Sequence, residues 1–200
     1  MTDVSKQRLL LATCNANKTR EVREILGGAW QVEDLTVRPD LPEVEETGET
    51  FEANARIKAL AGSAHYDGWV LADDSGLEVD ALDGAPGVRS ARFAGDDADM
   101  AANRALLLEK LREVRGQDRR GRFRCVLALA KGGEVVRTFS GSVEGFITPA
   151  ERGSGGFGYD SLFIPEGSCR TFAEFTSQQK HSCSHRGRAL AQAAAFLRQL

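Results

Sequence analysis

The sequence predicts an α/β fold with a mixed β-sheet. Short apolar runs typical of buried strands alternate with longer stretches that carry apolar residues at helical spacing. This alternation favours parallel strands joined by helices. Gly132 and Gly133 separate two further apolar runs, which indicates a β-hairpin and hence an antiparallel pair. Parallel and antiparallel pairing together make the sheet mixed.

The chain is expected to open with a strand, a tight polar turn and a helix. Consecutive leucines predict a buried strand over residues 8–13, and Val22, Ile25 and Leu26 fit a helix over 17–26. Further helices are expected over residues 51–66, 97–114 and 187–200, and further strands over 69–72, 122–130 and 134–148.

Composition describes an ordinary globular chain. Its 200 residues, 42% hydrophobic and 28% charged, predict one domain over residues 1–200. A formal net charge of −3 gives no support for a nucleic-acid or membrane partner. No apolar stretch approaches the roughly 18 residues of a membrane span, and residues 1–8 lack the apolar core of a secretory signal. We therefore expect a cytoplasmic protein.

The four cysteines, Cys14, Cys125, Cys169 and Cys183, form no CxxC pair. This spacing argues against a zinc site or a disulfide framework. Reduced thiols in a cytoplasmic protein explain it better.

A candidate phosphate site lies at the first strand-to-helix turn. Backbone N–H groups at a helix start favour an anion, and Lys18 adds a positive charge. A polar turn with a solvated lysine explains the same residues about equally well. The segment consists of Thr13, Cys14, Asn15, Ala16, Asn17 and Lys18.

A candidate magnesium site follows the strand over residues 69–72. Asp73 and Asp74, followed by Ser75 and Gly76, supply the carboxylate oxygens that Mg²⁺ prefers. The alternative is a charged turn. An acidic run between residues 43 and 52 would usually be a solvated loop, but one of its glutamates could reach a metal held by Asp74. The run contains Glu43, Glu45, Glu46, Glu49 and Glu52.

A candidate base site combines a glycine-rich segment with cations. Residues 153–158 match G-x-G-x-x-G, but no helix follows, so they are not a dinucleotide-binding fingerprint. Phe157 in this segment could instead stack on a purine. The alternative is a loop whose aromatic residues cap the core. Cations before the last helix oppose its dipole, which favours a binding role. They include Lys180, His181, His185, Arg186 and Arg188.

Arginines are concentrated between residues 112 and 124. We interpret them as an exposed helix end and loop rather than a nucleic-acid surface, because no aromatic residues interleave with them. They are Arg112, Arg115, Arg119, Arg120, Arg122 and Arg124.

Six segments together resemble the inosine triphosphatase family, also called Ham1-like non-canonical purine NTP pyrophosphatases. In this chain the segments read LATCNANK (11–18), EETGETF (45–51), ADDSGLEV (72–79), GAPGV (84–88), GFGYD (156–160) and SHRG (184–187). They occur in the family's order and spacing, and the resemblance extends over about residues 9–197.

The resemblance implies Mg²⁺-dependent hydrolysis of a purine triphosphate such as dITP, ITP or XTP to the monophosphate and pyrophosphate. It also implies a homodimer, and an elongated two-lobed fold with a twisted mixed sheet, flanking helices and the active site in the cleft between the lobes. Residues 13–18 and Lys58 would contact phosphate, Glu45 and Asp74 would hold the metal, and Asp74 would also be the proton acceptor. The remaining substrate contacts would be Ser75, Phe157, Gly158, Tyr159, Asp160, Lys180, His185 and Arg186.

Three positions depart from the family pattern, and none removes a charged or catalytic group. Cys14 replaces the glycine of most bacterial members, Ser161 replaces a proline, and Cys183 replaces an aliphatic residue.

Three other functions fit parts of the sequence. A nucleotide-sensing module could use the same lysines without turnover, and a nucleic-acid-binding protein could use the arginines. A Maf-like pyrophosphatase acting on other modified bases is the nearest enzymatic alternative.

Overall fold

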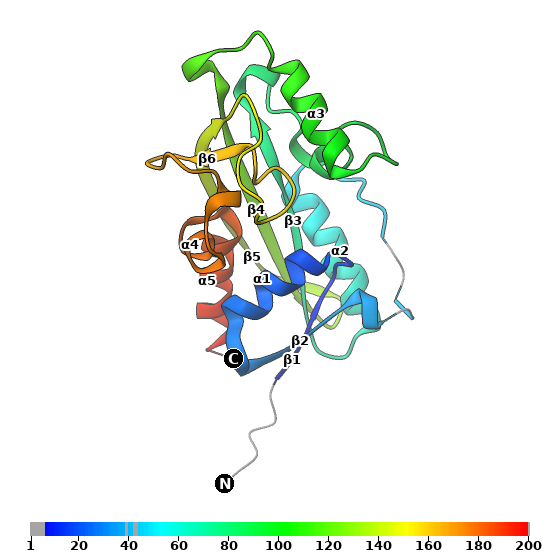
Figure 1. The fold of residues 1–200 in the computed structure, drawn as a ribbon. Helices are drawn as coiled ribbons and strands as arrows, with labels where there is room; N and C mark the ends of the chain where they lie inside the picture. Colours follow the sequence, from blue (N-terminus) through cyan, green and yellow to red (C-terminus); the bar gives the residue numbers. More distant parts are fainter. Residues whose placement is uncertain (1–6, 39, 42–43, 200) are drawn as a thin grey trace. The chain divides into compact units, whose positions relative to one another are not determined.

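The computed structural model describes residues 7–38, 40–41 and 44–199. Its strands form one six-stranded sheet in the order β2-β1-β3-β4-β5-β6 (Figure 1). The strand β1 pairs in parallel with β2 and β3, whereas β5 and β6 are antiparallel. The predicted α/β fold with a mixed sheet is confirmed.

The elements have the following bounds. The strands are β1 (Gln7–Leu11), β2 (Trp30–Asp34), β3 (Trp69–Val79), β4 (Arg120–Lys131), β5 (Glu134–Ile147) and β6 (Phe163–Pro165). The α-helices are α1 (Ala16–Leu26), α2 (Phe51–His65), α3 (Met100–Lys110), α4 (Ser177–Cys183) and α5 (His185–Leu197). Short 3₁₀ helices cover Gly27–Ala29, Leu35–Val37, Asp80–Leu82, Gly87–Arg92, Gly116–Arg119 and Phe172–Glu174.

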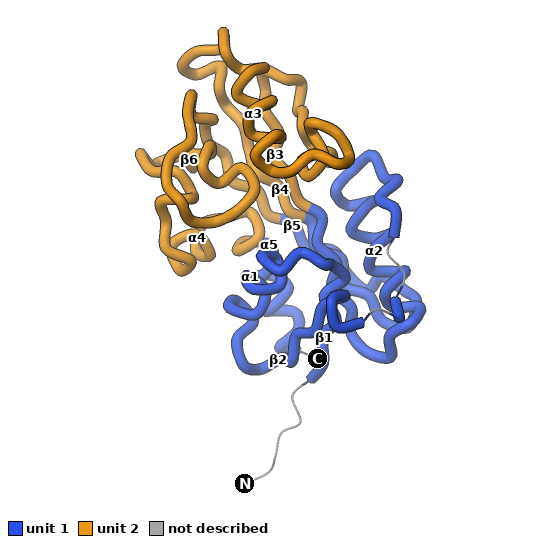
Figure 2. Tube along the Cα trace, turned by 45° about the vertical axis from the view of Figure 1, so that its right-hand side comes forward, with its two compact units in different colours: residues 1–74, 126–140, 189–200 blue, residues 75–125, 141–188 orange. Residues whose placement is uncertain are grey.

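The chain divides into two compact units, coloured separately in Figure 2. Unit 1 contains residues 1–74, 126–140 and 189–200, and unit 2 contains residues 75–125 and 141–188. The strands β3, β4 and β5 and the helix α5 each contribute residues to both units.

Local sequence explains the first helices. The side chain of Asn15 caps α1 by accepting hydrogen bonds from the amides of Asn17 and Lys18, and Gly27 ends this helix at φ +64°. Thr50 caps α2 by accepting from the amide of Ala53. At the predicted hairpin, Gly132 and Gly133 adopt φ values of +61° and +81°, as a type I′ turn requires.

One expectation about β3 is wrong. A strand ending at Ala72 was expected, with Asp73 and Asp74 directly after it, but β3 continues to Val79. The strand continues because Leu77 and Val79 are fully buried in unit 2, and because lysines pair with the carboxylates of Asp73 and Asp74. The magnesium candidates therefore lie within a strand.

The core of unit 2 is built largely from aromatic and aliphatic side chains of the sheet. Phe163 packs edge-on against Phe123 at a centroid distance of 4.8 Å and lies 5.4 Å from Phe172. Buried residues of β3, β5 and α3 complete this core, among them Leu77, Val143 and Leu107. The loops of unit 2 that carry site residues are anchored on it.

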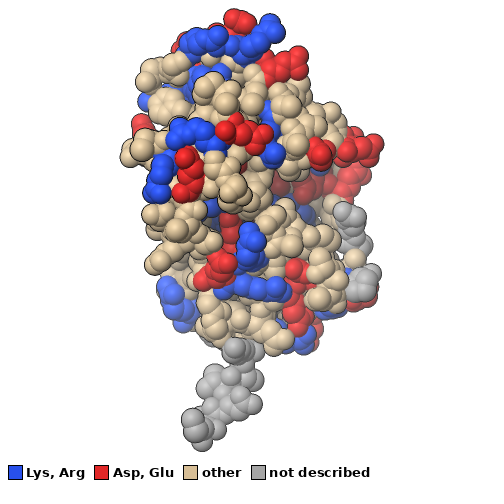
Figure 3. Space-filling model, in the orientation of Figure 1, with Lys and Arg blue, Asp and Glu red and all other residues tan. Residues whose placement is uncertain are grey.

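No helix in the described part of the chain is long and apolar enough to cross a membrane. On the face drawn in Figure 3, lysine and arginine side chains are interspersed with aspartate and glutamate. This face carries no large patch of one charge.

Candidate functional site

In the phosphate candidate of unit 1, the N-terminal amides of α1 and the ammonium group of Lys18 already have partners within the protein. Two amides at the start of α1 already donate to the side chain of Asn15, so they are not open to an anion while this cap is in place. The ammonium group of Lys18 pairs with the fully buried carboxylate of Asp73 and also lies 3.3 Å from the Asp73 carbonyl oxygen. The sequence analysis did not anticipate this ion pair.

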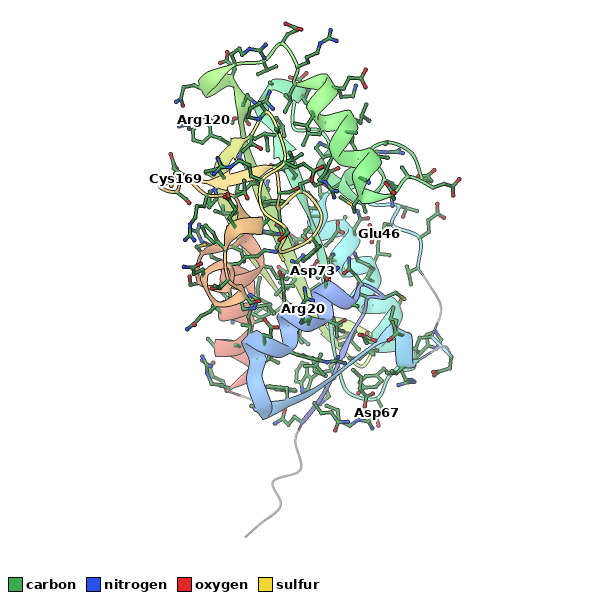
Figure 4. All side chains as sticks on the ribbon, in the orientation of Figure 1. Arg20, Glu46, Asp67, Asp73, Arg120 and Cys169 are labelled. Atoms are coloured by element: carbon green, nitrogen blue, oxygen red, sulfur yellow. The ribbon has the colours of Figure 1, made fainter. Side chains whose placement is uncertain are left out.

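Lys58, on α2, joins three acidic residues of unit 1. Its Nζ lies 2.7 Å from Glu46 Oε1, 3.1 Å from Asp74 Oδ1 and 2.9 Å from the carbonyl oxygen of Asp73. Figure 4 labels Glu46, in the loop before α2, and Asp73, on β3. Glu46 was predicted only as one member of the acidic run. We call Lys18, Glu46, Lys58, Asp73 and Asp74 the lysine–carboxylate cluster.

This cluster has more negative than positive groups, since three carboxylates face two lysines. Burial raises the pKa of Asp74; the charge of Lys58 opposes this effect and that of Glu46 adds to it. Burial alone would lower the pKa of Lys58, but Asp74, Glu46 and Asp73 outweigh it and raise that pKa. The cluster would therefore gain from one additional cation.

The second carboxylate oxygen of Asp74, Oδ2, is buried and accepts no hydrogen bond from the described residues. An unsatisfied anionic oxygen of this kind is a suitable ligand for a hard cation. Among the described residues, no three His, Cys, Asp or Glu side chains form a ready metal site. Mg²⁺ usually takes one or two carboxylates and completes its shell with water and substrate phosphate, and its binding at Asp74 stays a prediction. Glu45, the other predicted ligand, is exposed, and its role stays a prediction.

In unit 2, Asp160 organises the glycine-rich loop. Its Oδ2 accepts hydrogen bonds from Lys180 Nζ at 2.6 Å and from the amide of Phe157 at 2.8 Å. The side chains of Lys180 and Asp160 are only 6% and 4% exposed. Gly156, at φ +69°, allows the loop to turn here, because a Cβ atom at this position would lie 2.2 Å from Asp160 Oδ2.

The ring of Phe157 lies beside two cations. Lys180 Nζ is 4.6 Å from its centroid and the guanidinium carbon of Arg186 is 5.5 Å from it. Arg186 also donates to Ser75 Oγ at 2.7 Å. The ring of His185 stacks on Phe123 at 4.7 Å, which fixes its plane. Thus Ser75, Phe157, Asp160, Lys180 and Arg186, all predicted substrate contacts, come together within unit 2.

The side chain of Tyr159 does not join this group. Its hydroxyl donates to the Ser90 carbonyl oxygen at 2.8 Å, its ring belongs to the core of unit 2, and burial raises its pKa. A substrate contact of Tyr159 would therefore involve its backbone. The neighbouring carbonyl of Gly158 accepts from Arg104 at 3.2 Å. Arg104 was missed, since a lone arginine on a helix carries no local signal.

The arginines between residues 112 and 124 are not all exposed, which corrects our interpretation. The buried Arg119 donates to four carbonyl oxygens, those of Leu111, Val114, Ile147 and Thr148. Arg122 on β4 pairs with Asp80 at 2.8 Å and Glu144 at 3.0 Å. Arg119 and Arg122 thus have structural roles, because a guanidinium group that is buried or lies on a strand needs hydrogen-bond acceptors.

Comparison with known proteins agrees with this description. The model of the Ham1 family matches residues 9–196. The chain belongs to the Ham1 family. A Ham1 relative from Exiguobacterium sibiricum, named dITP/XTP pyrophosphatase, is 49% identical over 191 residues, which cover 95% of this chain and 96% of that protein. A dITP/XTP pyrophosphatase from Bacillus subtilis is 44% identical over 182 residues, covering 90% and 92%.

A solved Ham1 structure shares the fold. The HAM1 protein from Coxiella burnetii superposes with a TM-score of 0.87 at 38% identity, covering 97% of this chain and 100% of that one. The Ham1 family resemblance drawn from six short segments is therefore confirmed along nearly the whole chain.

Proposed function

We propose that this protein hydrolyses non-canonical purine nucleoside triphosphates such as dITP, ITP and XTP to the monophosphate and pyrophosphate. The observation that carries the proposal is the lysine–carboxylate cluster, in which the buried Asp74 keeps one carboxylate oxygen without a hydrogen bond. The names of the Ham1 relatives, dITP/XTP pyrophosphatase, support the same activity.

In this proposal the cluster of unit 1 performs the phosphate chemistry. Asp74, whose pKa is raised by burial, takes a proton from the water that attacks the α-phosphorus. The ammonium groups of Lys18 and Lys58 turn from their carboxylates to the phosphate oxygens and offset their charge. Asp74 and Glu45 would hold Mg²⁺, which supplies further neutralisation of the triphosphate when bound.

The predicted substrate contacts that come together in unit 2, around Phe157, would bind the base. The exposed part of Phe157 offers a stacking surface, and Arg186 and His185 supply donors for the six-position oxygen of hypoxanthine or xanthine. Adenine carries an amine there, which cannot accept these hydrogen bonds. Sites built around a hydrogen bond reject analogues that lack the acceptor by as much as ~10⁴-fold.

Two further expectations belong to the proposal. We propose a homodimer on the strength of the family resemblance. We also propose a cytoplasmic protein, which is supported by the cysteines: Cys14, Cys125, Cys169 and Cys183, all within the described residues, form no disulfide bond.

A screen of nucleoside triphosphates with pyrophosphate detection tests the function. We expect kcat/KM for ITP, dITP or XTP to exceed that for ATP by at least ~10²-fold. Excess EDTA should abolish turnover, and added Mg²⁺ should restore it. Nucleotide binding without pyrophosphate release would identify a sensing module instead, and a preference for other modified bases would favour the Maf-like alternative.

A further inference from the structure

A pocket lined by residues of unit 2 contains none of the residues of the proposed substrate site. Its cavity has a volume of ≈ 950 Å³, at the upper end of the roughly 300–1,000 Å³ of small-molecule sites. Apolar side chains form much of its wall, among them Leu108 and Val114 from the α3 region, Phe146 on β5 and Ile164 on β6. A wall of this kind would accept a ligand with an apolar or aromatic body, by which we mean the part of the ligand other than its charged group.

The charged residues of this pocket are all cations. Arg112, Arg115, Arg119 and Arg152 line it, and no aspartate or glutamate in the described part of the chain does. The whole chain, in contrast, carries a net charge of −3. Burial lowers the pKa of Arg119, and the nearby charge of Arg115 lowers it further, so these two guanidinium groups repel each other. An anion in the pocket would relieve that repulsion.

Three of the arginines have contacts that a ligand could share or replace. Arg112 pairs with Glu113, where both side chains are largely exposed, and such pairs contribute little. Arg115 donates to the carbonyl oxygens of Arg112 and Val114. Arg152 pairs with Glu174 at 3.1 Å and donates to the carbonyl of Cys169 at 2.8 Å. Each guanidinium has five N–H donors, so these contacts leave capacity for an anion.

Arg119 holds the walls of the pocket in place. It donates to Leu111 and Val114 after α3 and to Ile147 and Thr148 at the end of β5, at distances of 2.6–3.2 Å. The two walls are thereby tied together by one buried side chain. A preformed pocket loses less entropy when a ligand binds.

We propose that this pocket binds a phosphate-bearing small molecule with an aromatic or apolar body, such as a purine mononucleotide. Arginine is the side chain best suited to phosphate, since its planar fork donates two parallel hydrogen bonds to phosphate oxygens. Arg115 and Arg152 contact the phosphate, and the body lies against Phe146 and Ile164. The site is separate in its residues from the substrate site of the proposed function.

Equilibrium dialysis with radiolabelled AMP, without Mg²⁺, tests the proposal independently of turnover. AMP should bind saturably and more tightly than inorganic phosphate, which lacks the body, or adenosine, which lacks the charge. The double variant Arg115→Gln/Arg152→Gln should weaken AMP binding by at least about tenfold, since it removes both charges that contact the phosphate. Its hydrolysis of ITP should be unchanged.

Two further variants make the outcome decisive. Arg124→Gln/Arg170→Gln removes the same charge from exposed positions of unit 2 that do not line the pocket, and should bind AMP normally. Ala150→Trp fills the pocket without removing a charge, and should block AMP binding.

Three results would overturn the proposal. The first is the absence of saturable AMP binding up to about 1 mM. The second is AMP binding that Phe157→Ala removes and both pocket variants leave intact, since the ligand would then occupy the proposed substrate site. The third is unchanged AMP binding with an altered sedimentation mass of the pocket variants, which would assign the pocket to contact between copies of the chain.

Discussion

At the scale of single residues, Asp74 is the position where binding and chemistry can be separated. Replacing it by Asn keeps the size and one oxygen but removes the charge and the basicity. Loss of a general base costs ~10²–10⁴-fold in rate, whereas Lys18, Lys58 and the base site remain. We expect Asp74→Asn to lower kcat by at least ~10²-fold, while the affinity for ITP, measured by titration calorimetry, changes much less.

The control for this experiment is a variant at Lys18, and its design has to take account of the ion pair between Lys18 and Asp73. Lys18→Met alone would remove the cation that pairs with the fully buried Asp73 carboxylate, and breaking a buried ion pair costs about 3–5 kcal/mol in comparable cases. The double variant Lys18→Met/Asp73→Asn avoids that charge, and should lose ITP affinity as the larger share of its defect. A near wild-type kcat in Asp74→Asn would show that Asp74 is neither the base nor a metal ligand.

Ser161, which departs from the family's proline, gives a prediction about pH. Its hydroxyl donates to Glu151 at 2.7 Å and, together with Arg104, holds the pKa of that carboxyl below its usual value. A lowered folded-state pKa stabilises the protein above the unfolded pKa of roughly 4.3, and this stability is lost as pH falls through the folded value. Ser161→Ala should therefore destabilise the protein at pH 7 and much less at about pH 3.

The expected effect of Ser161→Ala is small, about 0.5–1 kcal/mol at pH 7, because Glu151 is 45% exposed and solvent screens its interactions. Urea unfolding at both pH values measures it. Ser168→Ala is the matched control, since among the described residues that hydroxyl has hydrogen bonds to the backbone of Arg170 alone, so this variant should have the same effect at both pH values. An equal loss for Ser161→Ala at pH 7 and pH 3 would contradict the prediction.

At the scale of elements, the glycine-rich loop depends on the space that Gly156 leaves for Asp160. An alanine there is strained at φ +69° and places its Cβ against the carboxylate that holds Lys180. Because these groups flank Phe157, we expect Gly156→Ala to raise KM for ITP more than it lowers kcat.

Gly167→Ala isolates the role of the carboxylate contact. Gly167 has a similar backbone angle, φ +83°, but a Cβ atom at this position would meet no described residue within 4 Å apart from its two chain neighbours. Both variants carry the backbone strain, so only the difference between them reports on Asp160. The same KM for Gly156→Ala and Gly167→Ala would mean that the Asp160–Lys180 contact does not position the base.

Elements with strong local signals were predicted from the sequence. The helices α1 and α2 and the hairpin of β4 and β5 have caps, glycines and apolar spacing that act locally. The strand β2 was missed although Trp30 and Val32 alternate with polar residues, because five residues give a weak pattern. The length of β3 could not be predicted, because Asp73 and Asp74 become acceptable in a strand only through lysines distant in sequence.

In the candidate site, too, local sequence signals were predicted and contacts between distant segments were not. Residue types were predicted from motifs, whereas pairings such as Lys18 with Asp73 and Lys180 with Asp160 join segments 55 and 20 residues apart. The Tyr159 ring lies in the core of unit 2 because of tertiary packing, which the local sequence likewise does not show. Whether the active site lies in a cleft between two lobes stays a prediction from the family resemblance.

At the scale of the whole molecule, the two units share their secondary structure. Three strands and one helix pass from one unit into the other without interruption, so neither unit contains these elements complete. If one unit unfolded alone, each of these elements would have to end in its middle, losing hydrogen bonds and packing on both sides of the boundary. We therefore expect one cooperative unfolding transition in urea.

The two tryptophans make this expectation measurable. Trp30 and Trp69 both belong to unit 1, so their fluorescence follows that unit alone, whereas far-ultraviolet circular dichroism follows both units. The two signals should have the same midpoint. Hydrogen exchange should then give similar opening free energies for the central amides of β1, in unit 1, and of β5 beside β6, in unit 2. A fluorescence midpoint that differs from the circular dichroism midpoint, with amides of one unit exchanging at lower urea, would show instead that β3, β4 and β5 can each break where they pass from one unit into the other.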